Sequence, residues 1–117
     1  MDAALRSQIR SLCSGIDTGA LDPYAAASEM HGLGMRNAAR PDGKADDEAW
    51  AHWLIWGALT DWIEVRPAEK VQAEAAIVDA ARKWLTVEGD PVARLAYFDR
   101  MIYDVCGYAR PENPPSN

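Results

Sequence analysis

Apolar residues recur at helical rather than strand spacing along most of this 117-residue chain. Near the N-terminus they repeat every three or four positions, at Leu5, Ile9, Leu12 and Ile16. This spacing predicts an amphipathic helix that extends from about Asp2 to Ser14 and ends at Gly15. No segment alternates with period two over the length of a strand, so the pattern predicts an all-α fold.

An Asp-Pro pair indicates the start of a second helix. Asp22 can accept hydrogen bonds from the first free amides of that helix, and Pro23 suits the first helical position because it lacks an N–H. We expect the helix to run from Pro23 to about Gly32. One of its sides carries Tyr24, Ala27 and Met30.

The helical pattern then stops between Gly34 and Lys44, where Pro41 and a following Asp-Gly pair are turn signals. We expect this segment to be the longest loop of the chain. A third helix is predicted from Asp46 or Asp47 to about Glu64, since acidic residues in a first turn complement the helix dipole.

Two more helices are predicted in the C-terminal half. The fourth begins at Arg66-Pro67, and its apolar stripe is expected to comprise Val71, Ala75, Val78, Ala81 and Leu85. The fifth begins at Asp90-Pro91, ends at Gly107 and directs inward Leu95, Phe98, Ile102 and Val105. The chain is therefore expected to be one helical domain, residues 1–108, a single bundle of five helices with a disordered Pro-rich tail at residues 109–117.

Four tryptophans lie within thirteen residues of the third helix, namely Trp50, Trp53, Trp56 and Trp62. At 100° per residue they fall at roughly 0°, 300°, 240° and 120°, so they do not form one stripe. Aliphatic residues fill most of the remaining circle, which is typical of a helix surrounded by others. We expect the third helix to be the central one, with Trp53 and Trp56 in the core.

The other two tryptophans are candidates for a binding surface. Trp50 lies within roughly 40° of Asp61 and Glu64 on the helical wheel. Buried carboxylates are costly, so this band is expected to face solvent. The stretch from Asp46 to Glu64 holds five acidic residues and no Lys or Arg. An exposed aromatic beside carboxylates is typical of a protein-binding surface, and a solvated acidic face would give the same pattern.

Composition narrows the class of partner. Twelve Lys and Arg against eighteen Asp and Glu give a net charge of −6, which argues against nucleic acid and favours a basic partner. Solubility alone also accounts for an acidic balance. The chain has no apolar run near the roughly 20 residues that cross a membrane, and no signal peptide. Because Cys13 and Cys106 form no disulfide framework, a cytoplasmic location is expected.

The sequence contains no phosphate-binding loop, nucleophile elbow or zinc-binding helix, so neither an enzyme nor a cofactor is predicted. A small metal-binding bundle or enzyme remains an alternative, built from His31, Glu48, His52 and Asp61, although the Glu-x-x-His pattern of di-iron bundles is absent. The other interpretation is that His52 is packed or partly exposed and that His31 ends a helix and bonds to carbonyls.

The segment Thr60-Asp61-Trp62-Ile63-Glu64-Val65-Arg66 precedes a long helix rich in Ala and Glu and a last helix with a cysteine. Over about the second half of the chain, this arrangement resembles small helical bacterial immunity proteins of toxin systems. The resemblance implies a cytoplasmic protein that binds a toxin domain and blocks it, with an acidic face against a basic cleft. It carries over only Asp61, Trp62, Glu64 and Arg66.

The leading hypothesis is an acidic protein-binding module. Its predicted partner-binding residues are Asp46, Asp47, Glu48, Trp50, Asp61, Trp62, Glu64 and Arg66. A third alternative is a homo-oligomeric structural protein that buries Trp62 against a second copy. Nucleic acid and membranes are not expected as partners.

Overall fold

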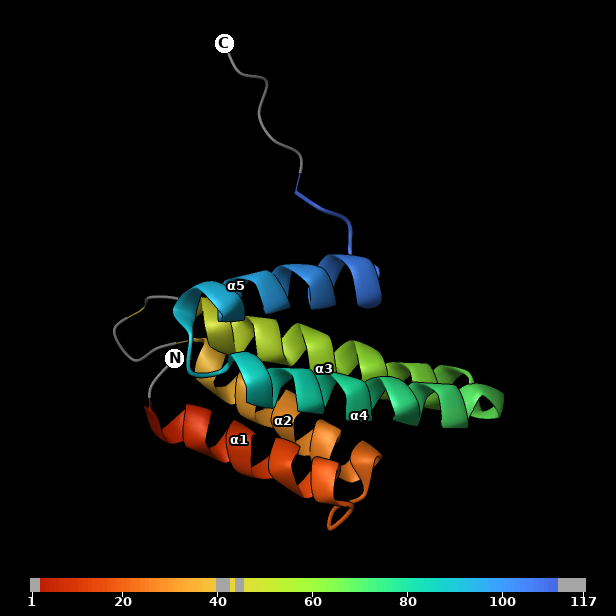
Figure 1. Ribbon diagram of the computed structural model, residues 1–117. Helices are drawn as coiled ribbons and strands as arrows, with labels where there is room; N and C mark the ends of the chain where they lie inside the picture. The colour runs from red at the N-terminus through yellow and green to blue at the C-terminus, as the bar shows by residue number, and fades with distance from the viewer. Residues whose placement is uncertain (1–2, 40–42, 44–45, 112–117) are drawn as a thin grey trace.

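The computed structural model describes residues 3–39, 43 and 46–111, which form helices and turns with no β-strand among them. The predicted all-α fold is confirmed. In chain order the elements are α1 (Ala3–Thr18), α2 (Pro23–Ala38), α3 (Asp47–Val65), the 3₁₀ turn η1 (Pro67–Glu69), α4 (Lys70–Val87), α5 (Pro91–Asp99) and its π-helical continuation η2 (Arg100–Val105) (Figure 1). Residues 112–117 of the predicted tail lie outside the described residues. No helix in the described ranges combines the length and apolar character needed to cross a membrane.

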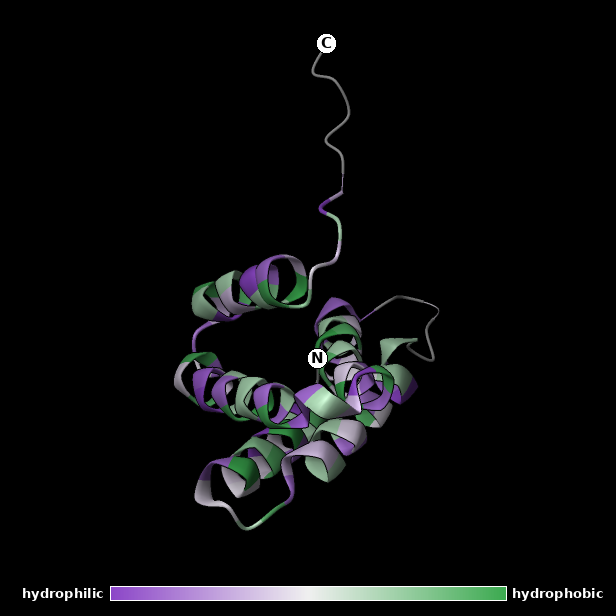
Figure 2. Ribbon diagram, turned by 90° about the vertical axis from the view of Figure 1, so that its right-hand side faces the viewer, coloured by the Kyte–Doolittle hydropathy of each residue, from purple (hydrophilic) through white to green (hydrophobic). Residues whose placement is uncertain are grey.

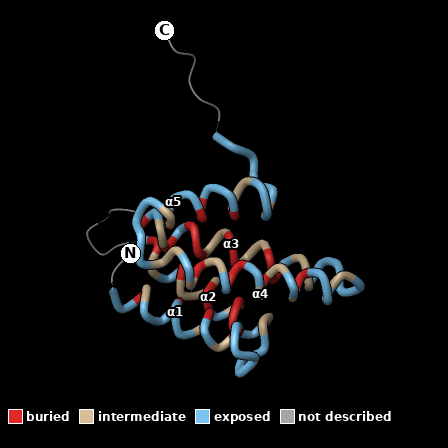
Figure 3. The backbone as a smooth tube through the Cα atoms, in the orientation of Figure 1, coloured by how far each residue is buried: buried red, intermediate tan, exposed pale blue. Residues whose placement is uncertain are grey.

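Helix α3 is a core helix that contacts α2, α4, η1 and η2, while α4 contacts α1, α2, α3 and α5. The α3–α4 hairpin extends beyond the ends of α1, α2 and α5 (Figure 1). Buried segments gather where the helices face one another (Figure 3), and each helix carries both hydrophobic and hydrophilic residues (Figure 2). Trp56 is fully buried, whereas Trp53 is only partly buried. Only one of the two tryptophans predicted for the core is therefore fully inside it.

Helix α1 buries Leu5, Ile9 and Ile16 as predicted, together with Cys13, while Leu12 is only partly buried. The helix does not end at Gly15. A Cβ at Gly15 would lie 2.4 Å from Cδ1 of Leu21, so this glycine leaves room for the returning chain. The helix instead ends at Thr18, and Gly19 follows with a φ of 78°, a conformation that glycine adopts readily.

Helix α2 begins as predicted, with the Asp22 carboxylate accepting a hydrogen bond of 2.9 Å from the amide of Ala25. It then continues to Ala38, so the predicted end at Gly32 and the first part of the predicted loop, from Gly34 to Ala38, are wrong. Residues 40–42 and 44–45 of that region lie outside the described residues. Gly34 lies where α2 crosses α3, and a Cβ there would be 2.5 Å from the backbone nitrogen of Trp53. Close helix packing requires this glycine, which is why it does not mark a break.

Gly34→Ala is expected to lower the free energy of unfolding by about 1 to 3 kcal/mol, the usual cost of forcing an extra carbon into a packed interior. The cost arises because the added carbon meets the α3 backbone, which cannot rotate away. Gly32→Ala is the matched control in the same helix. Its Cβ would meet only the mobile end of Arg36, at 2.9 Å, so we expect a gain of about 0.5 to 1 kcal/mol from helix propensity. Urea denaturation measures both, and equal effects would contradict the close-packing role.

The predicted inward stripes of the last two helices are wrong in part. On α4 Val71 is 79% exposed, and the buried residues are Ala73, Ile77, Ala80, Ala81 and Trp84. On α5 Leu95 is 67% exposed, whereas the buried residues are Arg94, Tyr97 and Phe98, followed by Met101 of η2. Apolar spacing alone could not select this face of α5, because it includes a buried arginine and a tyrosine. The wider turns of η2 then change the register, which leaves Val105 exposed.

Candidate functional site

Two of the three predicted acidic residues at the start of α3 have structural partners. Asp46 is buried and caps α3 by accepting a hydrogen bond of 3.1 Å from the amide of Ala49. Glu48 accepts one of 2.8 Å from Nε of Arg94, in an ion pair whose side chains are only 19% and 11% exposed. Asp47 alone of this triplet is exposed. An arginine from α5 thus partly neutralises the stretch from Asp46 to Glu64, which contains no Lys or Arg of its own.

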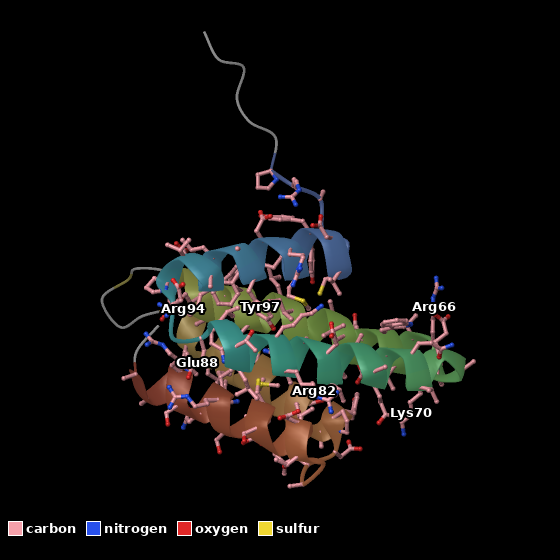
Figure 4. All side chains as sticks on the ribbon, in the orientation of Figure 1. Arg66, Lys70, Arg82, Glu88, Arg94 and Tyr97 are labelled. Atoms are coloured by element: carbon pink, nitrogen blue, oxygen red, sulfur yellow. The ribbon has the colours of Figure 1, made fainter. Side chains whose placement is uncertain are left out.

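A surface cavity of about 510 Å³ lies farther along α3. Its α3 side extends from Trp53 to Glu64, α2 contributes Ser28 and His31, and Tyr108 comes from the chain after η2. We call this cavity the α3 groove. It lies on the opposite half of α3 from Arg94, which Figure 4 places near the beginning of α5.

The acidic end of the α3 groove is formed by Asp61 and Glu64, both exposed. The hydroxyl of Tyr24 donates a hydrogen bond of 2.7 Å to Glu64, and this bond raises the pKa of Tyr24. Burial, followed by the negative charges of the Cys106 thiolate and then of Asp61, raises the pKa of Tyr108. No Lys or Arg lines the groove within the described part of the chain, and no described cation pairs with Asp61. The groove is therefore a site of negative potential.

The other end of the groove is aromatic. Trp50 is 47% exposed and packs edge-on against Trp53, with ring centroids 4.5 Å apart. His31 Nδ1 lies 3.0 Å from the Trp53 carbonyl oxygen. Because a carbonyl oxygen can only accept, Nδ1 carries the proton and donates the hydrogen bond. The ring packs on Gly57, where a Cβ would lie 2.7 Å from Nδ1. His31 does bond to a carbonyl as predicted, but from the middle of α2 rather than its end.

Trp50 and Asp61 face the same side of α3, since residues eleven apart differ by roughly 20° around a helix. Both are exposed, as the helical wheel predicts. They are nevertheless about 16 Å apart along the axis at 1.5 Å per residue. The predicted band is therefore an elongated stripe with the α3 groove along it, rather than one compact patch.

Trp62 and Arg66 line a different groove, of about 350 Å³, between α3, η1 and the end of η2. The Trp62 indole nitrogen donates a hydrogen bond of 3.1 Å to Glu69, and Arg66 lies 3.5 Å from the same carboxylate. Ala58 borders both grooves. Trp62 therefore lies in this neighbouring groove, whereas Asp61 and Glu64, the two carboxylates predicted to accompany it, line the α3 groove.

The residues of the metal-binding alternative are not assembled into one site. His52 is fully buried, and its Nδ1 accepts a hydrogen bond of 3.0 Å from the indole nitrogen of Trp56. Its ring lies edge-to-face with Trp84 and Phe98 at centroid distances of 4.6 and 5.3 Å, on the side of α3 away from His31. Burial lowers the pKa of His52 to about 3. Within the described ranges, no three His, Cys, Asp or Glu side chains are placed to hold a metal ion.

The fold and the groove define an all-α helical bundle that exposes an elongated groove, aromatic at one end and acidic at the other. No family model, curated protein or solved structure matches the chain. The functional assignment therefore depends on the physical character of this surface.

Proposed function

We propose that the protein is a protein-binding module that receives a basic surface of its partner in the α3 groove. The observation that carries this proposal is the pair Asp61 and Glu64 on a cavity of about 510 Å³ that no described Lys or Arg lines. Carboxylates arranged in this way attract cationic side chains, and charge complementarity speeds association and selects among partners. Trp50, exposed beyond the other end of the groove, is the type of residue that anchors protein interfaces.

The resemblance to bacterial immunity proteins supports a more specific form of the proposal, in which the partner is a basic toxin domain that binding neutralises. Two of the residues that the resemblance carries over, Asp61 and Glu64, line the α3 groove. The other two, Trp62 and Arg66, line the neighbouring groove across Ala58. A partner that spans both grooves would contact all four residues.

Replacing both groove carboxylates, in the variant Asp61→Asn with Glu64→Gln, is expected to weaken partner binding by about tenfold or more at low salt. The effect should shrink between about 50 and 300 mM salt because exposed charges are increasingly screened. Glutamine at position 64 retains an oxygen that can accept the Tyr24 hydrogen bond, so the local packing is preserved. Surface plasmon resonance against the captured partner measures the change.

The matched control is Asp17→Asn with Asp79→Asn, which removes the same net charge from exposed positions outside the groove. The partner is first obtained by affinity capture from the native cell with the wild-type protein as bait. Capture that depends on Asp61 and Glu64 but not on the control pair supports the proposal. If the control pair weakens binding as much as the groove pair does, net charge rather than the groove accounts for the effect and the proposal fails. Light scattering shows whether the captured partner is a second copy of the chain.

A further inference from the structure

We infer that the α3 groove binds an amphipathic α-helix of the partner, with an apolar residue and a Lys or Arg about seven positions apart on the same face. This inference rests on the proposed function and specifies its partner. It follows from the shape of the groove, the chemistry of its two ends and the distance between them.

The walls of the groove favour a helix over an extended segment. An extended peptide gains affinity mainly by pairing its backbone with a sheet edge, whereas the described residues contain no β-strand. Helices α2 and α3 satisfy their own backbone groups, so most of the groove presents side chains. A helix also satisfies its own backbone and can pack its side chains into such a surface. The floor contains Ala58, whose small side chain allows a second helix to approach closely, and beside it the His31 ring covers Gly57.

The length of the groove fits about three helical turns. Along α3 its lining extends from Trp53 to Glu64, eleven steps of about 1.5 Å or roughly 16 Å. Three turns of a partner helix span nearly the same length, since each turn rises about 5.4 Å. A shorter partner helix would leave one of the two ends of the groove without a contact.

The two ends set the chemistry and polarity of the occupant. Trp53, Leu54 and the adjoining Trp50 suit an apolar side chain at one end. Asp61 and Glu64 suit a guanidinium or ammonium group at the other, which can also approach the ring of Tyr108. Trp53 and Asp61 are eight residues apart, about 12 Å along α3. Residues seven apart on a partner helix share a face and rise about 10.5 Å, and the reach of Lys or Arg covers the difference.

Two peptides of the same composition test this spacing. Each has about 15 residues, is built on alanine and glutamine, and carries a hydrocarbon staple on its far face because short isolated helices are marginal in water. The first peptide carries one leucine and one arginine seven positions apart. In the second they are five positions apart, which places them on opposite faces of the helix. Both are titrated against ¹⁵N-labelled full-length protein by NMR, up to millimolar concentration.

We expect the first peptide to bind at least about fivefold more tightly than the second and to shift the amide signals of Trp53 to Glu64 and the indole signal of Trp50. In the Asp61→Asn, Glu64→Gln variant the affinity of the first peptide should fall to that of the second, while the Asp17→Asn, Asp79→Asn variant should leave it unchanged. Equal affinity of the two peptides, absence of binding by the first, or signal shifts confined to other surfaces would overturn the helix inference. The proposed function is judged separately, by the dependence of partner capture on Asp61 and Glu64, so the two can fail independently.

Discussion

Arg94→Met is expected to lower the free energy of unfolding by about 3 kcal/mol, at the lower end of the range for breaking a buried ion pair. Arg94 joins three parts of the bundle. Its Nε donates to Glu48 of α3 and its Nη1 donates a hydrogen bond of 2.8 Å to the carbonyl oxygen of Glu88, after α4. Methionine keeps much of the apolar stem but removes the charge that balances the largely buried Glu48 carboxylate. Urea denaturation followed by circular dichroism measures the loss.

Arg110→Met provides a matched control for the loss of an arginine ion pair. Arg110 contacts Asp99 and Asp104, but its side chain is 53% exposed. We therefore expect this variant to lower the free energy of unfolding by less than about 1 kcal/mol. A double variant, Arg94→Met with Glu48→Leu, removes both buried charges together and should recover most of the stability lost in the single variant. Similar losses for the Arg94 and Arg110 variants would contradict a special role for the buried pair.

The second large effect concerns acid stability and depends on His52. Burial lowers its pKa from 6.5 to about 3 in the folded protein, so below pH 6.5 the unfolded chain binds a proton that the folded chain does not. The stabilising contribution is complete above pH 6.5 and decreases as the pH falls toward 3. Between pH 7.5 and pH 5 we expect a loss of about 2 kcal/mol from this group, from 1.5 pH units at 1.36 kcal/mol each.

His52→Gln should remove this loss, because glutamine does not titrate and its oxygen can still accept the hydrogen bond from Trp56. The measured quantity is the slope of unfolding free energy against pH from 7.5 to 5, a range largely above the titration of ordinary carboxylates. The glutamine variant will be less stable at neutral pH, which does not affect the comparison of slopes. The wild-type slope, measured under the same conditions, is the reference for this comparison. Identical slopes for the wild type and His52→Gln would show that His52 is not the cause.

The candidate site was predictable where a single helix determines it. The angular positions of Trp50, Asp61 and Glu64 on α3 follow from helical periodicity, and the structure exposes all three. Two side-chain partners of the α3 carboxylates come from elsewhere in the chain. Arg94 neutralises Glu48 from a distance of 46 residues, and Tyr24 reaches Glu64 across 40. Spacing within one segment contains no information about such contacts.

The remaining walls of the α3 groove were missed for the same reason. Ser28, His31 and Tyr108 line it from α2 and from the chain after η2. Tyr108 lies in a segment without helical periodicity, so no signal marked it. If Gly34 is interpreted as a helix-packing glycine, α2 continues past it, and His31 is then predicted in the middle of the helix rather than at its end.

The sequence by itself determined the helical class, the positions at which α2, α3 and α5 begin, and the place of α3 in the core. These properties depend on local chemistry, namely apolar spacing, aspartate caps and proline at first helical positions, which acts within one or two turns of the chain. Only the tertiary structure decided which glycines end helices and which allow helices to cross, because a glycine has the same local propensity in both roles. It also decided which carboxylates remain exposed, since burial and pairing depend on residues that meet only when the bundle is packed. That decision separates Asp46 and Glu48, which stabilise the fold, from Asp61 and Glu64, which line the α3 groove.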